Sequence, residues 1–181
     1  MPDIRFTRRF SMAHRLLAEA DSKCIVPHGH NEFVQVTLRS DQAPDFGGSN
    51  YVASFDRLKS RWHGFIDRAV DHAFQLNAAD PLLGWFLAHE PARASRLMIF
   101  QGDPTSEALA IALRRKLDAI LKDEASPFRC VGLTLEETPT NAVIVGETLS
   151  AGETAWMAGS WMDRPDLSIN DLDVIPCEPA A

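Results

Sequence analysis

The chain has 181 residues, of which 45% are hydrophobic and 24% are charged. These fractions are typical of a globular protein, and the length predicts one domain with room for an appendage. The formal net charge of −7 argues against a general nucleic-acid binder, although it leaves room for a local basic pocket that holds a phosphorylated small molecule.

The chain carries no signal for a membrane or for secretion. No apolar run approaches the roughly 20 residues needed to span a bilayer, and the start MPDIRFTRRF lacks the features of a signal peptide. We therefore expect a cytoplasmic location, with no membrane or nucleic-acid partner. Three scattered cysteines, Cys24, Cys130 and Cys177, are too few for a disulfide framework, and no second Cys-rich cluster completes a Cys₄ or Cys₂His₂ zinc site.

The first predicted elements are two strands. Apolar residues and histidines share one parity from Ile4 to His14, with Arg8 as the exception, and again at most alternate positions from His28 to Leu38, which is the period of two expected for strands. Residues 15–27 form the connection, so we expect a wide antiparallel hairpin. The segment SFDRLKSRWHGFIDRAV (54–70) then spaces its apolar residues for one face of a helix.

The second half of the chain predicts a helix followed by two strands. RLMIF (96–100) predicts a short extended piece, and residues 102–124 predict a strong helix capped by Asp103 or Thr105. RCVGLTLEE (129–137) and NAVIVGE (141–147) predict two more strands. The fold class is thus α+β, with ββααββ order and two helices packed on one face of an antiparallel sheet. We place this domain at 1–149, with an insertion at 78–95 and an acidic C-terminal extension at 150–181 that Trp156 and Trp161 can anchor.

Three histidines form a candidate metal site. His28 and His30 are two residues apart on a predicted strand and therefore share a face, and His14 ends the neighbouring strand on the matching parity. Three neutral imidazoles with a fourth position open are the arrangement of catalytic zinc. The same spacing also fits histidines at the rim of a sheet that bond to the backbone, and spacing alone leaves both readings open.

Two other features can carry proton transfer. Cys24 lies four residues before His28 and can be a fourth zinc ligand, a reactive thiolate near a metal, or an inert buried thiol. In the adjacent pair Asp71 and His72, the carboxylate can orient the imidazole for proton transfer, or the pair can be the exposed end of a helix.

Six motifs in this order resemble the 6-pyruvoyl-tetrahydropterin synthase family: FSMAHRL, CIVPHGHN, FDRLK, VDHAFQLN, DPTSEALA and LEETPTNAV. The short Cys-x₃-His-Gly-His spacing favours its bacterial branch, the 6-carboxy-5,6,7,8-tetrahydropterin synthases of the queuosine (7-deazaguanine) pathway. The likeness covers roughly residues 4–77 and 96–147.

The resemblance implies a tunnelling fold, in which ββααββ subunits assemble as trimers whose sheets close a barrel, often paired into hexamers, with active sites at subunit interfaces. It also implies roles for ten residues. These are zinc binding by His14, His28 and His30, catalysis by Cys24, Asp71 and His72, anchoring of the pterin ring by Glu137, and a second patch near the pterin at Thr105, Ser106 and Glu107.

The implied activity is that of a zinc-dependent lyase. It converts 7,8-dihydroneopterin triphosphate into 6-carboxy-5,6,7,8-tetrahydropterin and releases acetaldehyde and triphosphate. Two alternatives stay open: a 6-pyruvoyl-tetrahydropterin synthase or dihydropterin side-chain aldolase on the same fold, and a non-catalytic zinc- or pterin-binding assembly protein. Ser54 departs from the family pattern, which commonly has Asp there. No triphosphate clamp is evident, and the candidate cations are Arg8, Arg9, Arg15, Lys23 and Lys59.

Overall fold

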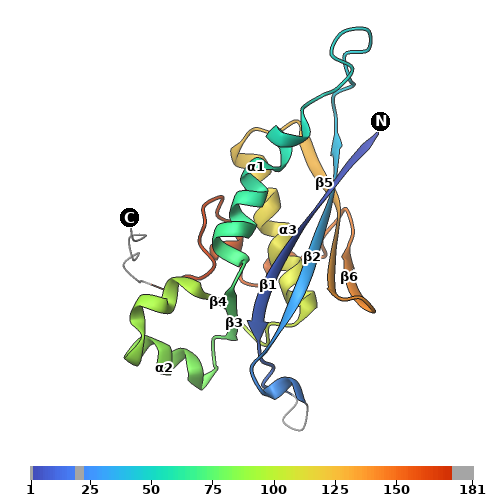
Figure 1. Cartoon of the computed structure of the whole chain (residues 1–181). Coiled ribbons are helices and arrows are strands. Elements are labelled where there is room, and N and C mark those ends of the chain that lie inside the picture. The colour runs from blue at the N-terminus through green and yellow to red at the C-terminus, as the bar shows by residue number, and fades with distance from the viewer. Residues whose placement is uncertain (1, 19–22, 173–181) are drawn as a thin grey trace.

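The computed structural model describes residues 2–18 and 23–172. Its centre is one six-stranded sheet in the order β4-β3-β1-β2-β5-β6 (Figure 1). The strands are β1 (Asp3–His14), β2 (His28–Ser40), β3 (Ala73–Asn77), β4 (Leu97–Phe100), β5 (Phe128–Thr138) and β6 (Asn141–Val145). The α-helices are α1 (Phe55–Phe65), α2 (Pro81–His89), α3 (Ser106–Asp123) and α4 (Ala151–Ala155). Shorter helical turns are η1 (Lys23–Ile25), η2 (Ile66–Val70, a π-helix), η3 (Pro91–Arg96) and η4 (Trp161–Asp163).

The predicted hairpin is confirmed. β1 and β2 pair antiparallel along their full length, from Asp3 opposite Arg39 to His14 opposite His28. Every second side chain is buried from Phe10 onward in β1 and from Glu32 onward in β2. This fixes the register, because a slip of one residue would turn the buried set to solvent. β5 continues the sheet on the far side of β2, and β6 pairs with β5 as its edge strand.

Helices α1 and α3 cover one face of the sheet, as predicted (Figure 1). Both begin at a side-chain cap. Ser54 accepts a hydrogen bond from the Arg57 amide at 3.4 Å, and Thr105 accepts one from the Ala108 amide at 3.3 Å. Ser54 therefore keeps a capping oxygen at the position where the family pattern commonly has Asp. The described part of the chain contains no helix with the length and apolar character to cross a bilayer.

The sheet is mixed, which corrects the expectation of a wholly antiparallel one. β3 pairs parallel with the last residues of β1, and β4 pairs parallel with β3. The chain reaches this position because α1 runs into the π-helix η2, and His72 then turns the backbone with a φ of +63°. The amide of His72 donates to the carbonyl of Ser11 at 2.7 Å, so the turn is attached to β1 before β3 begins.

The predicted insertion, residues 78–95, contains α2 and most of η3. Asp80 caps α2 by accepting from the Leu82 amide at 2.8 Å, and Pro81 occupies its first turn. Leu83 of α2 packs with residues of β3 and β4 in a small core separate from the main one. The insertion therefore rests on the two parallel strands.

The C-terminal segment to residue 172 packs against α3 and β4. The indole N–H of Trp161 is fully buried and donates to the Ile99 carbonyl at 3.0 Å, and that of Trp156 donates to the Gln101 carbonyl at 3.1 Å. Both tryptophans are thus anchors, as predicted. Further along, the carbonyl of Ile169 accepts from the amide of Ile99 and covers the edge of β4.

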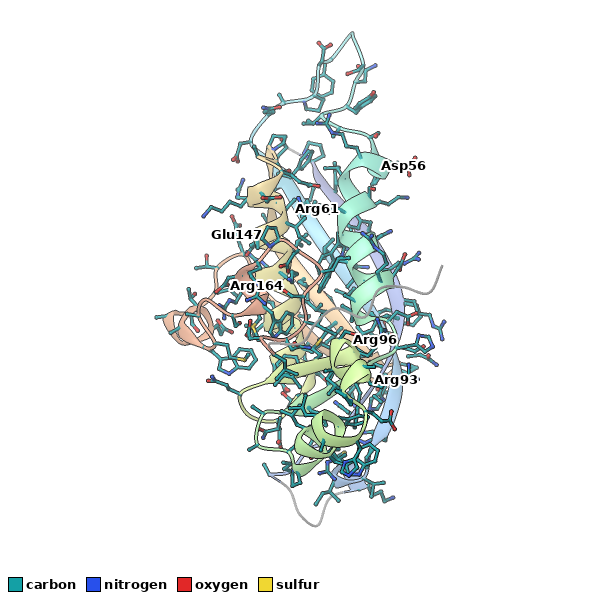
Figure 2. The ribbon with its side chains drawn as sticks, turned by 90° about the vertical axis from the view of Figure 1, so that its left-hand side faces the viewer. Asp56, Arg61, Arg93, Arg96, Glu147 and Arg164 are labelled. Carbon is teal, nitrogen blue, oxygen red and sulfur yellow. The ribbon has the colours of Figure 1, made fainter. Side chains whose placement is uncertain are left out.

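Three consecutive basic residues of α3, Arg114, Arg115 and Lys116, are buried. Arg115 makes a two-pronged ion pair with Asp163, with its shortest contact at 2.7 Å. The ammonium of Lys116 donates to the Arg164 carbonyl at 2.7 Å and lies 5.1 Å from the centre of the Phe65 ring. Figure 2 shows the C-terminal segment with Arg164 lying across α3. The buried cations therefore fasten this segment to the helix.

Candidate metal and active site

The three predicted histidines meet at one end of the β1–β2 hairpin. His14 lies opposite His28, and His30 is the next residue on the same face of β2. The Nε2 atoms of His14 and His28 are 3.1 Å apart, and one ring nitrogen from each of the three residues lies within 4.8 Å of the other two. Strand pairing alone produces this convergence, because opposite residues of an antiparallel pair share a face.

Backbone carbonyls orient two of these rings. Nδ1 of His14 lies 2.9 Å from the Pro104 carbonyl, and Nδ1 of His28 lies 2.8 Å from the Val26 carbonyl. Each Nδ1 must carry the proton to donate to its carbonyl, so the Nε2 atoms are the ones that point toward each other. Burial lowers the pKa of His14, against the opposing effect of the Pro104 carbonyl, and so favours the neutral ring. Ring nitrogens that face one another, with Nδ1 of two rings bonded to backbone carbonyls, are the donor arrangement of a zinc site, so these residues fit the ion.

A cavity of about 410 Å³ opens beside the histidines. It brings together residues from β1, η1, the start of α3 and the β5–β6 hairpin. Its walls contain His14 and all of the predicted catalytic-cysteine and pterin-binding residues, namely Cys24, Thr105, Ser106, Glu107 and Glu137. Residues separated by more than a hundred positions in sequence thus line one space next to the candidate metal site.

Glu137 is held at the wall of this cavity. Its Oε1 accepts a hydrogen bond from the Ser106 hydroxyl at 2.7 Å and lies 3.9 Å from Nε2 of His30. Ser106 is the first residue of α3, so the start of the helix fixes the position of the carboxylate. A carboxylate in this setting can accept two parallel N–H donors from a planar ring.

Two buried polar side chains beside the histidines were not among the predicted site residues. Glu32 is on the face of β2 that carries His30, and Gln75 of β3 pairs with His14. Within the described residues, the carboxylate of Glu32 and the amide of Gln75 have no hydrogen-bond partner. Burial, with a smaller effect of the Glu137 charge, raises the pKa of Glu32 to about 8. The alternation of side chains along HGHNE puts Glu32 on the same face as the two histidines, a signal that the sequence prediction did not use.

The Asp71–His72 pair lies elsewhere in the chain's own structure. Burial opposes ionisation of Asp71, but hydrogen bonds from the Ser11 amide at 2.7 Å and from His72 hold its pKa below the usual value. Nδ1 of His72 is 3.0 Å from Oδ2 of Asp71, and its ring is 76% exposed. The pair is attached at Ser11, three residues or roughly 10 Å along β1 from His14, and is not part of the wall that contains Cys24.

The candidate phosphate-binding cations are mostly engaged within the chain. Arg8 pairs with Asp67 through two contacts of 2.6 and 2.7 Å, and Lys59 lies 3.2 Å from Asp56. Arg15 forms a two-pronged ion pair with Asp80, while Arg9 donates to Asn31 at 2.7 Å. Lys23 is exposed in η1, next to Cys24. Of the five candidates, Lys23 is therefore the best placed beside the cavity.

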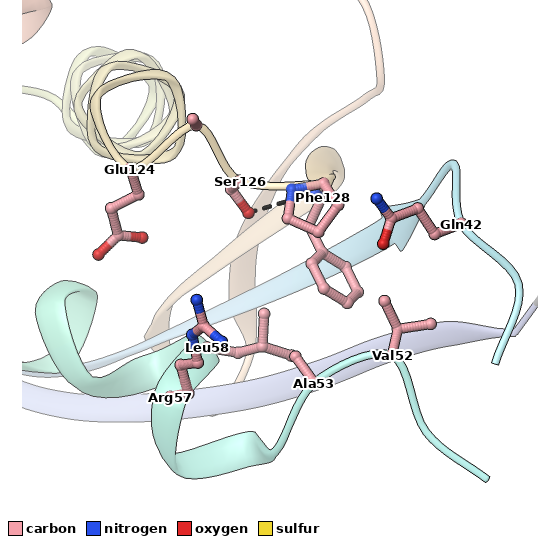
Figure 3. A pocket seen from close by; sticks show the side chains of 10 residues that line it. Gln42, Val52, Ala53, Arg57, Leu58, Glu124, Ser126 and Phe128 are labelled. Atoms are coloured by element: carbon pink, nitrogen blue, oxygen red, sulfur yellow. Dashed lines mark hydrogen bonds between the residues drawn. The ribbon is translucent and has the colours of Figure 1, made fainter. Parts of the chain in front are cut away.

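A second cavity, of about 430 Å³, lies where β2 ends and β5 begins (Figure 3). Val52, Leu58 and Phe128 supply its apolar walls, and Arg57 and Glu124 are its charged residues. It contains none of the predicted catalytic or metal-binding residues. The candidate site is therefore at the opposite end of the hairpin.

Comparisons with known proteins identify the family of the chain. A model of the 6-pyruvoyl tetrahydropterin synthase family matches residues 3–148. The chain is 32% identical over 131 residues to a probable 6-carboxy-5,6,7,8-tetrahydropterin synthase from Halobacterium salinarum, which covers 72% of this chain and 77% of that protein. It is 30% identical over 90 residues to a 6-carboxy-5,6,7,8-tetrahydropterin synthase from Aquifex aeolicus, covering 49% of this chain and 53% of that protein.

Solved structures share the fold. The 6-pyruvoyl tetrahydropterin synthase of Caenorhabditis elegans superposes with a TM-score of 0.52 at 27% identity, covering 82% of this chain and 98% of that one. An uncharacterized protein from Wolinella succinogenes superposes with a TM-score of 0.61 at 21% identity, covering 81% and 98%. The predicted α+β tunnelling fold is confirmed.

Proposed function

Because the chain belongs to the 6-pyruvoyl tetrahydropterin synthase family, whose members are lyases, we propose that it is a zinc-dependent enzyme of pterin metabolism. Its substrate is 7,8-dihydroneopterin triphosphate, and its products are 6-carboxy-5,6,7,8-tetrahydropterin, acetaldehyde and triphosphate, in the queuosine pathway. The observation that carries the proposal is the convergence of His14, Cys24 and Glu137 in one cavity beside His28 and His30. The names of the two curated relatives favour the carboxy product over the pyruvoyl one.

The three histidines would hold the zinc ion through ring nitrogens. A bound zinc ion supplies Lewis acidity, which lowers the free-energy cost of removing protons from hydroxyl groups of the substrate side chain. Among the described residues, the cluster within ligand distance consists of the three histidines, and Cys24 is not a member of it. This favours an open catalytic site over a closed structural one, in which Cys24 would be the fourth ligand.

The other residues bind the ring and move protons. Glu137, held by Ser106, accepts hydrogen bonds from the amino group and ring N–H of the pterin, an anchor of roughly 1.5–3 kcal/mol. Thr105 and Glu107 line the same wall near the ring. Cys24 takes a proton from the side-chain carbon next to the hydroxyl groups, and His72, oriented by Asp71, relays protons on the other side.

We further propose that the enzyme works as a homo-oligomer, a trimer or a hexamer. Asp71 and His72 lie outside the cavity that contains Cys24, so the pair can serve the reaction when it reaches the cavity of a neighbouring subunit. The high exposure of His72 supports this reading.

The test is to incubate zinc-loaded protein with 7,8-dihydroneopterin triphosphate and to identify the products by mass spectrometry. The 6-carboxy product together with acetaldehyde is the expected result. A 6-pyruvoyl product would show that the protein is instead a 6-pyruvoyl-tetrahydropterin synthase. No turnover by a zinc-bound oligomer would refute the catalytic proposal.

A further inference from the structure

Asp80, at the start of the insertion, contacts the segment that leads to Cys24. Its side chain is fully buried and accepts a two-pronged contact from Arg15, with Nε at 2.6 Å from Oδ2. Arg15 directly follows the metal-ligand candidate His14 and is itself mostly buried. A buried two-pronged guanidinium–carboxylate pair fixes orientation as well as distance, unlike an exposed ion pair.

Asp80 is itself held in place. Its Oδ1 accepts from the Leu82 amide at 2.8 Å, and its own amide donates to the Asn77 carbonyl at 2.9 Å. Asp80 is therefore attached both to α2, which it caps, and to the end of β3. A carboxylate held by two elements is a stiff support for Arg15.

The segment is fastened at two more points. The amide of Leu16 donates to the carbonyl of Cys24 at 2.9 Å, so the backbone next to Arg15 is bonded directly to the proposed catalytic residue. The amide of Ala18 donates to Asp103 at 2.7 Å, and Asp103 also accepts from the Asn77 side chain at 2.9 Å. Asn77 thus lies between the two carboxylates that hold the segment.

We infer that Asp80 is a positioning residue, which acts through Arg15 and Leu16 to hold Cys24 at the wall of the cavity. This inference rests on the proposed catalytic role of Cys24. It gives the insertion a role in positioning a catalytic residue. It also makes Arg15 a poor candidate for a triphosphate ligand, because Asp80 occupies the Nε–Nη2 edge of its guanidinium. A displacement of about 1 Å at a reacting group can cost a hundredfold in rate, so a support of this kind matters for turnover.

The test compares Asp80→Asn with wild type. Asn keeps the size of the side chain and its ability to cap α2, but it removes the charge that holds Arg15. Arg15→Lys is the second variant, because it keeps the charge and loses the two-pronged geometry. Glu90→Gln is the matched control: it is the same chemical change at the other end of α2, on an exposed residue whose ion-pair partner is Arg93.

The first readout is the rate at which iodoacetamide alkylates Cys24, followed by peptide mass spectrometry on the zinc-loaded protein. We expect this rate to rise threefold or more in Asp80→Asn and Arg15→Lys and to be unchanged in Glu90→Gln. The second readout is turnover of the pterin triphosphate, where kcat falls tenfold or more and KM changes by less than threefold. Zinc content and the melting temperature are measured on every sample.

Unchanged alkylation and kcat in a folded Asp80→Asn protein would overturn the inference. So would a loss of zinc that matches the loss of activity, because the ion pair would then act on His14. If Asp80→Asn does not fold, Arg15→Lys decides by the same criteria. If wild type turns over no pterin while alkylation still responds to Asp80→Asn, the proposed function fails and the positioning by Asp80 stands.

Discussion

Replacing Lys116 by Met tests whether a charge is buried at the centre of the contact between α3 and the C-terminal segment. Lys116 is fully buried, with its ammonium between two backbone carbonyls and 3.5 Å from Oδ1 of Asp166. Burial lowers its pKa from 10.5 to about 8, with Asp166 opposing the change. Met has a similar length and an unbranched chain but no charge, so it removes the titration with little change in packing.

The magnitude follows from the pKa. Each pKa unit corresponds to about 1.4 kcal/mol, so the charged form of Lys116 is about 3 kcal/mol less favourable in the folded state than in the unfolded chain. Between pH 8 and 10.5 the unfolded chain binds more protons at this residue than the folded protein does, so this residue makes stability rise with pH. Relative to Lys116→Met, wild type should therefore gain about 2–3 kcal/mol of unfolding free energy from pH 7 to pH 10.

The assay is urea unfolding at fixed chain concentration, followed by tryptophan fluorescence at four pH values between 7 and 10. The Met variant also removes the hydrogen bonds to the carbonyls of Arg164 and Asp166, which changes the unfolding free energy at every pH. The test of the pKa is therefore how the difference in unfolding free energy between wild type and variant changes with pH. Lys122→Met, on the exposed last turn of α3, should follow the wild-type pH dependence. If the unfolding free energies of wild type and Lys116→Met differ by the same amount at every pH, burial does not lower the pKa of Lys116 and the prediction is wrong.

Three further predictions concern the site and the C-terminal segment. Cys24→Ala should keep zinc and the oligomer but lose at least a hundredfold in kcat, and a fall in zinc content by half or more, measured by plasma mass spectrometry, would show that Cys24 is a metal ligand. His28→Ala should lose both zinc and turnover, and an active, zinc-free variant would sink the three-histidine site. Trp161→Phe should lower the unfolding free energy by about 1–3 kcal/mol in urea titrations, since the indole bond to the Ile99 carbonyl is lost; a change below 0.5 kcal/mol would contradict its role as an anchor.

Local patterns were sufficient to predict the elements with one buried face. β1 and β2 alternate clearly, and α3 combines a Thr105 cap with a long apolar stripe. β3 was not predicted, because it has only five residues, most of them buried, and shows no alternation. β4 is buried at every position, and the sequence predicted it only as the short extended piece at 96–100. The start of α2 could have been predicted from Asp80-Pro81, because a capping Asp followed by proline is typical of the beginning of a helix.

The candidate site also has features that local sequence predicts and features that it does not. The convergence of the three histidines follows from strand parity, which is a local property. The separation of Asp71–His72 from Cys24 depends on the π-helix and on the left-handed turn at His72, which sequence periodicity does not encode. Arg15 pairs with Asp80, which is 65 positions away, and no local pattern predicts this contact, so Arg15 stayed among the phosphate candidates.

The position of the C-terminal segment bears on how a fragment of this protein should be designed. The family match ends at residue 148, and a gene fragment cut there would look complete by homology. It would lack Asp163, the partner of Arg115, and the carbonyls that receive Lys116, and it would uncover the surface that Trp161 fills. Arg115 and Lys116 would then lose these partners, and the apolar surface under Trp161 would be exposed to solvent. Both changes would fall on α3, the helix whose first turn supports Glu137. The segment that the family model matches is therefore shorter than the segment that packs as one unit in this structure.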